Sequence, residues 1–259
     1  MKVIGYLLVG LLAYLVFMLL LFPASPVIKR FNLAPLTLSG ISGPLWNGEV
    51  AAVEAPNNVM PTGPDKFLLE DLSWRVAPLQ LFTGAGAAKV GFNAYGGAGS
   101  ALVAQGLGGD TTVSDLHYQS TGSALNVLLD PFLKIGGELE LEVSRLVLRD
   151  QLLQSFDGTL RWRNATLEVP TEAKLGDLLM TVTPSGEKHT AEISSSGGDL
   201  ALSGKVDVEK NGNFQTDITI KPSPAAPREL TDMLRGMARP SSDGSFRIRR
   251  NGNVNRLAG

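Results

Sequence analysis

The chain has 259 residues, a formal net charge of −2 and no cysteine. The absence of cysteine excludes a disulfide framework, a thiolate nucleophile and a cysteine-based zinc site. The 23 Lys and Arg residues are interspersed with 25 Asp and Glu residues, so no basic block predicts binding to nucleic acid or to an anionic surface.

The first predicted element is Val3–Phe22, an uncharged apolar run that follows only two residues. A helix of about 20 residues matches the roughly 30 Å hydrocarbon core of a bilayer, whereas a helix in a protein core would show a polar face. A cleavable signal peptide is shorter and has small residues at its cut site, but cleavage after Ala24 would place bulky Phe22 there. We therefore predict an uncleaved transmembrane signal-anchor over residues 3–22, behind a cytoplasmic tail of residues 1–2.

Charge alone leaves the orientation of this helix open, because Lys2 and the α-amino group nearly balance Lys29 and Arg30 on the other side. A two-residue tail before a long apolar run favours export of the bulk of the chain. Three prolines then predict an extended stalk over residues 23–35 that leads away from the bilayer.

Residues 36–259 are predicted to form one β-rich domain, because most apolar residues there recur with a period of two. The clearest alternation runs through Gly136–Ser144, which is typical of an antiparallel strand with one solvated face. A change of parity at Arg145 predicts a bulge. Gly197-Gly198 and Asn211-Gly212 predict tight hairpin turns.

Two other strands are predicted from parity. The first carries Leu68, Leu72, Trp74 and Val76 on one face, with Glu70 as a charged exception, and the second carries Val113, Asp115 and His117 on one face. Two short helices are expected at Ser123–Leu133, capped by Ser123, and at Arg228–Ala238. The predicted fold class is mainly β: a transmembrane helix followed by a large antiparallel sheet, curved or sandwich-like, with two short helices.

The sequence contains no convincing catalytic or metal-binding constellation. His117 and His189 lie in separate predicted strands, and a zinc site would need carboxylates to complete it. No complete dinucleotide-binding glycine loop and no nucleophile elbow occur. The glutamates of one strand face, Glu138, Glu140 and Glu142, could indicate a glycosidase or a cation site, but a solvated sheet face is the favoured interpretation. We expect no catalytic residue, no cofactor, no metal and no enzymatic activity.

Trp46, Trp74 and Trp162 each lie in a strand-like context. Because a large ring with one polar group suits a packed core whose N–H finds a partner, we predict that all three are structural anchors. A partner-binding surface is the alternative role for the same residues.

The order of several motifs resembles that of the general secretion pathway protein N family of the bacterial type II secretion system. After Val3–Phe22, the resemblance is carried by Leu38–Gly48, Leu72–Gly84, Phe156–Ala165 and Leu200–Gly204. It implies a single-pass protein of the bacterial inner membrane with the bulk of the chain in the periplasm. It also implies a non-catalytic role in exporting folded proteins across the outer membrane, through contacts with other secretion-system proteins of the inner membrane and periplasm.

The rhythm of strand, tryptophan, proline, leucine and glycine is also similar to AsmA-type envelope proteins, which build curved sheets with an apolar groove. This fold-level analogy implies an alternative function, in which a β groove binds or passes lipid. A third hypothesis, an envelope hydrolase, would require a pocket in which residues such as His117 and a carboxylate converge.

Overall fold

The computed structural model describes residues 14, 18, 21–28, 36–57, 64–76, 86–106, 108–149, 152–169 and 171–253. Most of the predicted signal-anchor Val3–Phe22 lies outside these residues, so it stays a prediction. Within the described part of the chain, no helix has the length and apolar character needed to cross a membrane.

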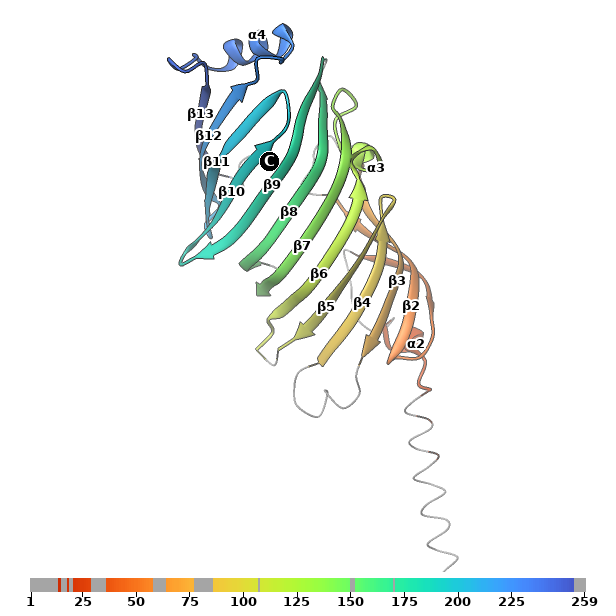
Figure 1. Ribbon diagram of the computed structural model, residues 1–259. Coiled ribbons are helices and arrows are strands. Elements are labelled where there is room, and N and C mark those ends of the chain that lie inside the picture. The colour runs from red at the N-terminus through yellow and green to blue at the C-terminus, as the bar shows by residue number, and fades with distance from the viewer. Residues whose placement is uncertain are drawn as a thin grey trace, which may run out of the picture.

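The described chain forms one antiparallel sheet of 13 strands, in which every strand pairs with its neighbours in the sequence. The sheet curls along its length, and the two edge strands β1 and β13 do not meet (Figure 1). The strands are β1 (Thr37–Ser42), β2 (Asn47–Pro56), β3 (Lys66–Val76), β4 (Gly86–Ala94), β5 (Gly97–Gln105), β6 (Thr111–Thr121), β7 (Lys134–Arg149), β8 (Leu152–Val169), β9 (Thr171–Ser185), β10 (Lys188–Ser196), β11 (Leu200–Glu209), β12 (Asn213–Pro222) and β13 (Phe246–Asn253).

The predicted mainly β, antiparallel and curved architecture is confirmed, and the sandwich-like alternative is wrong for the described residues, which form a single layer. The turn at Asn211-Gly212 joins β11 to β12, with the Gly212 N–H donating to the Glu209 carbonyl at 2.9 Å. The predicted bulge after Val143 is present as a register shift against β8.

Bulges correct two of the predicted strand faces. Asp71 has a φ of 48° and Asp115 a φ of 49°, and the ladder register shifts at each of them. One extra residue in a strand exchanges its two faces beyond that point. Glu70 therefore lies on the opposite face from Leu72, and Val113 lies on the opposite face from His117.

The helix predicted at Ser123–Leu133 is shorter in the structure. α3 (Gly122–Leu125) continues into the 3-10 helix η2 (Asn126–Leu128), and Thr121 rather than Ser123 caps it by accepting a hydrogen bond from the Ala124 N–H.

The segment predicted as an extended stalk includes the helix α2 (Ala24–Ile28). α2 begins where the Ala24 N–H donates to the Gly43 carbonyl at 3.1 Å, which holds it against the β1–β2 turn.

The predicted helix at Arg228–Ala238 is confirmed as α4 (Arg228–Met237). Leu230 and Leu234, each 2 % exposed, pack into the main hydrophobic cluster of the sheet. The cluster joins α4 to strands β8, β9, β11 and β13, so this helix covers one end of the sheet (Figure 1). The sheet residues of the cluster are Ala165, Ala173, Leu175, Leu200 and Phe246.

Candidate functional site

One face of the sheet, called here the inner face, carries a row of uncharged residues, one from each strand from β4 to β13. We call these residues the inner row. Cross-strand partners follow one another through ten positions, so the row is a property of the register and not of any one strand. The row consists of Phe92, Gly99, Tyr118, Leu141, Leu160, Met180, Ile193, Gly204, Ile218 and Ile248.

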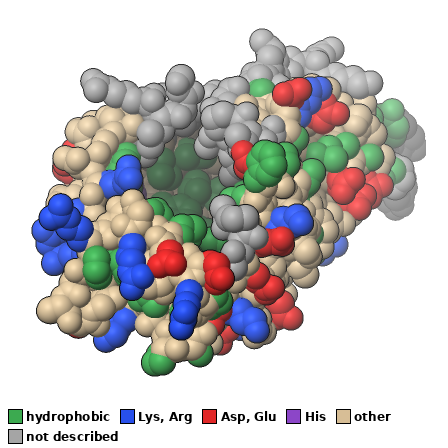
Figure 2. Space-filling model, turned by 90° about the horizontal axis from the view of Figure 1, so that it is seen from above, with side chains coloured by type: hydrophobic (Ala, Val, Ile, Leu, Met, Phe, Trp, Pro, Cys, Tyr) green, Lys and Arg blue, Asp and Glu red, His purple; other side chains and the backbone are tan. Residues whose placement is uncertain are grey.

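Every residue of this inner row is only partly buried. In a two-layer protein such positions would be covered by the opposing layer, but a single layer leaves them open. Seen from the end that carries α4, the molecule is hollowed, and hydrophobic side chains line the hollow (Figure 2). The inner face thus forms an apolar trough, which can hold an apolar chain but offers little polar chemistry.

Exposed apolar side chains also lie at the α4 end of the trough. Met233 and Met237 on α4 are 40 % and 58 % exposed, and Val127 and Phe132, on η2 and the turn after it, are 60 % and 86 % exposed. Both segments follow strands that end on this side of the sheet.

One titratable group of the inner face, His189 on β10, is buried. Its Nε2 accepts a hydrogen bond from the backbone N–H of Phe156 at 3.1 Å. Burial lowers the pKa of His189, and the positive charge of Lys210 lowers it further. Its neutral imidazole therefore satisfies a backbone donor, which is a structural role.

The three tryptophans predicted as anchors are partly buried. The Trp74 indole N–H donates to the Leu45 carbonyl at 2.8 Å, and the Trp162 indole N–H donates to the Gly136 carbonyl at 2.7 Å. Trp162 also packs against the hydrophobic cluster under α4. Trp46 lies in the β1–β2 turn, and its carbonyl accepts from the Val76 N–H at 2.7 Å. These contacts fit anchoring, and the role itself stays a prediction.

The opposite, outer face is charged. Glu142 lies 2.7 Å from Arg161, and Glu140 lies 3.0 Å from Arg163 on the neighbouring strand β8. The hydrogen bond from Arg161 lowers the pKa of Glu142. Two of the three strand glutamates considered for a glycosidase, Glu140 and Glu142, thus form cross-strand ion pairs, as expected for a solvated sheet face.

The structure does bring His117 close to a carboxylate, with 3.8 Å between its Nδ1 and Oε1 of Glu142. The pair lies on the exposed outer face, and Arg161 already holds Glu142. A hydrolase needs a nucleophile aligned with a base in a sheltered site, which this surface pair does not provide. Within the described part of the chain, no group of three or more potential ligands could hold a metal ion.

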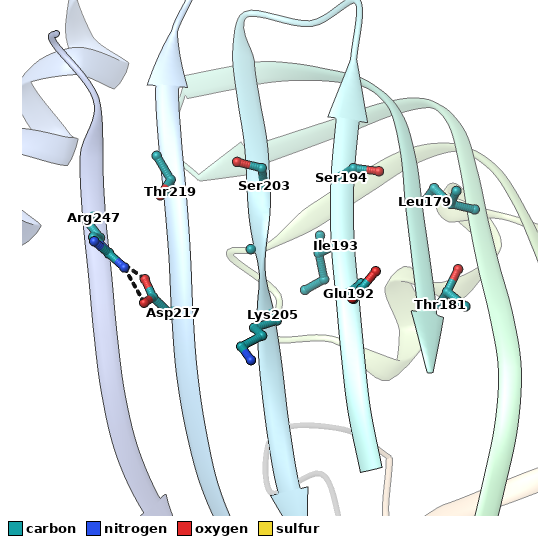
Figure 3. A pocket seen from close by; sticks show the side chains of 11 residues that line it. Leu179, Thr181, Glu192, Ile193, Ser194, Ser203, Lys205, Asp217, Thr219 and Arg247 are labelled. Carbon is teal, nitrogen blue, oxygen red and sulfur yellow. Dashed lines mark hydrogen bonds and ion pairs between the residues drawn. The ribbon is translucent and has the colours of Figure 1, made fainter. Parts of the chain in front are cut away.

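A shallow cavity of about 480 Å³ lies on the outer face between β9 and β13. Small side chains at Ser194, Ser203 and Thr219 leave space there, and Arg247 forms an ion pair with Asp217 at its side (Figure 3). Its described lining holds hydroxyl groups but no histidine that could activate one. The cavity is therefore a shallow depression of the solvated outer face and not a catalytic site.

Sequence reasoning did not identify the inner row. Each strand showed its alternation, but the row appears only when the register of all the strands is known. The bulges at Asp71 and Asp115 further hid which residues share a face. Alternate residues of a strand share a face, and Asp or Asn can mark a bulge that interrupts this alternation. Assigning faces separately before and after each Asp or Asn would identify part of the inner row.

The chain matches the family model described as "Type II secretion system (T2SS), protein N" over residues 34–249, more than four-fifths of its length. A type II secretion system protein N of Aeromonas hydrophila is 26 % identical over 254 residues, which cover 94 % of this chain and 96 % of the relative. A protein of the same name from Vibrio cholerae is 26 % identical over 231 residues, which cover 85 % of each chain. No solved structure matches the chain.

Proposed function

Because the chain belongs to the type II secretion system protein N family and is a component of that system, we propose that it acts there without catalysis. Its sheet domain makes protein–protein contacts that contribute to export of folded proteins across the outer membrane. It is anchored in the inner membrane by Val3–Phe22, with the sheet in the periplasm.

The observation that carries this proposal is the extent of the family match. Residues 34–249 begin just before β1 and end within β13, so the matched region is the sheet itself. A sheet with two separate edges and a charged outer face offers long surfaces for docking. Glu140 and Glu142 on that face are held in ion pairs, which supports a structural role for them.

Affinity purification tests the proposal most directly. The tagged full chain would be cross-linked in cells and isolated from solubilised membranes, with an unrelated single-pass periplasmic protein as the control. We expect other secretion-system proteins to be enriched with this chain and absent from the control. Recovery of none of them would contradict the proposed contacts.

The proposed topology has its own test. In spheroplasts, external protease should digest the sheet domain of the wild-type chain, because we place it outside the inner membrane. Protection of the domain in intact spheroplasts, with digestion only after lysis, would overturn that placement.

A second candidate function is favoured by the open trough. The half-exposed inner row provides an apolar path across the sheet, and burial of an acyl chain there would yield about 0.8 kcal/mol for each CH₂ group removed from water. The Phe22 carbonyl accepts from the Leu45 N–H at 2.8 Å. The end of the proposed membrane span is therefore tied to the sheet, which would keep the trough near the lipid.

Two neighbouring residues on opposite faces provide a matched test of lipid binding. Met180 belongs to the inner row, whereas Leu179 lies on the outer face and is 41 % exposed. With the full chain in detergent and a fluorescent fatty acid as the probe, we expect Met180→Gln to weaken binding and Leu179→Gln to leave it unchanged. Equal effects of both substitutions, or no binding to the wild-type chain, would exclude the trough as a lipid site.

A further inference from the structure

We propose that the free edge of β13 binds an extended, acidic segment of a partner protein as an additional strand. This contact would be one of the protein–protein contacts of the proposed function, and to that extent the inference rests on that function. It is carried by the backbone geometry of β13, by its charge and by a groove beside it.

The backbone of β13 presents unpaired hydrogen-bonding groups away from β12. The Arg250 N–H donates to Thr216 Oγ1 on β12 at 3.1 Å, so residue 250 points toward β12. Successive residues of a strand alternate in direction, and the polar backbone groups of Arg249 and Asn251 therefore point outward. No further strand pairs on that side within the described residues.

Among the described residues, only those before β13 pair with this edge, and they do so at its start. An isolated antiparallel bridge joins Pro240 to Phe246, and the Ser241 N–H donates to the Ser245 carbonyl at 2.7 Å. The chain leading into β13 thus covers its first residue. The edge from Arg249 onward is left for another strand, and an incoming segment would continue the ladder that this bridge begins.

The edge is strongly basic. Residues 221–253 contain seven Lys and Arg residues against three Asp and Glu residues, although the whole chain carries a net charge of −2. Lys and Arg side chains gather on the side of α4 and the C-terminal strands, at the left of Figure 2. Arg247 and Arg249 share Asp217, whereas Arg239 and Arg250 form no ion pair within the described part of the chain.

A groove of about 400 Å³ runs beside the strand. Met237 and Ala238, at the end of α4, form its apolar side, and Arg249, Arg250 and Asn251 form the other. Strand addition takes affinity from backbone hydrogen bonds and specificity from pockets for alternate side chains. This groove accepts an apolar residue between acidic neighbours.

The same charges oppose pairing of β13 with the β13 of a second copy of this chain. Pairing β13 with β13 would place three arginines against three arginines, and like charges on facing strands destabilise a sheet. Charged edges commonly prevent association of identical sheets. An acidic segment would instead be attracted to these arginines. The charge of the edge therefore disfavours a basic strand and favours an acidic one.

Peptide binding tests the inference without any secretion component. The probe is a fluorescein-labelled heptapeptide of alternating Glu and Val, titrated with the full chain in detergent and followed by fluorescence anisotropy. Comparison peptides carry Lys in place of Glu, or the same Glu and Val residues with alternate backbone nitrogens methylated. We expect the acidic peptide to bind and both comparison peptides to bind at least about tenfold more weakly.

Protein variants locate the site. Arg250→Glu should weaken binding of the acidic peptide about tenfold, whereas Arg235→Glu, the same charge change on the exposed face of α4, should change it less than about twofold. Asn251→Pro removes an outward-facing N–H without removing a bond to β12 and should also weaken binding. Bound peptide should slow hydrogen exchange at the amides of residues 249 and 251.

Equal binding of the lysine peptide or the methylated peptide would overturn the inference, as would equal effects of the Arg250 and Arg235 variants. If Asn251→Pro does not fold, the Arg250 variant and the methylated peptide still decide the result. Failure here leaves affinity purification of secretion components unaffected, so the two proposals fail separately.

Discussion

Truncation of Leu234 tests how α4 is held on the sheet. Leu234 is 2 % exposed and belongs to the cluster with Leu200, Leu230 and Phe246, whereas its neighbour Met233 is 40 % exposed. Leu234→Ala removes three carbons from a packed site, worth about 2.4 kcal/mol at about 0.8 kcal/mol each, and the cavity left behind raises the loss to about 3–4 kcal/mol.

The matched control is Met233→Ala, which also removes apolar atoms from α4 but at a position half open to solvent. We expect it to cost less than about 1 kcal/mol. Urea unfolding followed by tryptophan fluorescence measures both, because Trp162 packs against the same cluster. Equal losses of stability in the two variants would show that Leu234 does not hold α4 on the end of the sheet.

Three further outcomes are expected. Burial holds the pKa of His189 below its ordinary 6.5, so protonation favours the unfolded chain. The free energy of unfolding should fall as the pH drops below 6.5, and His189→Gln should lose that part of the dependence in urea titrations at pH 7 and pH 5; an unchanged slope would argue against a buried imidazole. The hydrogen bond and charge of Arg247 lower the pKa of Asp217 from 3.8 to about 2, so its stabilising contribution is present above pH 3.8 and is lost as the pH falls toward 2. Asp217→Asn should flatten acid unfolding in that range, whereas a profile identical to wild type would indicate that the ion pair contributes nothing. Trp162→Phe removes the bond to the Gly136 carbonyl and should cost about 1–2 kcal/mol in urea unfolding; a neutral effect would contradict its anchoring role.

Elements that depend on local sequence could be predicted. Asn211-Gly212 turns the chain with Gly212 at a φ of 86°, which glycine adopts readily, and α4 lies where Leu230 and Leu234 recur at helical spacing. The alternation of Gly136–Ser144 likewise requires a strand with unlike faces. In each case the necessary information lies within a few residues.

The bulges at Asp71 and Asp115, unlike the one at Arg145, could not be predicted from the parity of a single strand. Asp71 and Asp115 adopt left-handed backbone conformations that Asp tolerates, but Asp157 lies within β8 without a positive φ. The choice depends on the register of the neighbouring strand. Parity within one strand therefore places Glu70 and His117 on the wrong faces.

The number of layers could not be predicted from the sequence either. An apolar face has the same alternating pattern whether a second sheet covers it or leaves it open, so Leu141 and Leu160 were compatible with a sandwich. Only their partial exposure distinguishes the two cases. The basic edge could not be predicted either, because the sequence does not show which strand lies at the edge of the sheet. Arg249 and Arg250 line an edge only because β13 is the last strand.

Strand order that follows sequence order has a consequence for how the molecule is made. Each strand requires only the strand before it, so a growing chain can add hairpins one after another with short loop closures and low contact order. Such a chain need not await its C-terminus before its first strands pair. Its stability should resemble that of a linear array, in which neighbours contribute in series, and removal of one hairpin should shorten the sheet while leaving the connectivity of the rest intact.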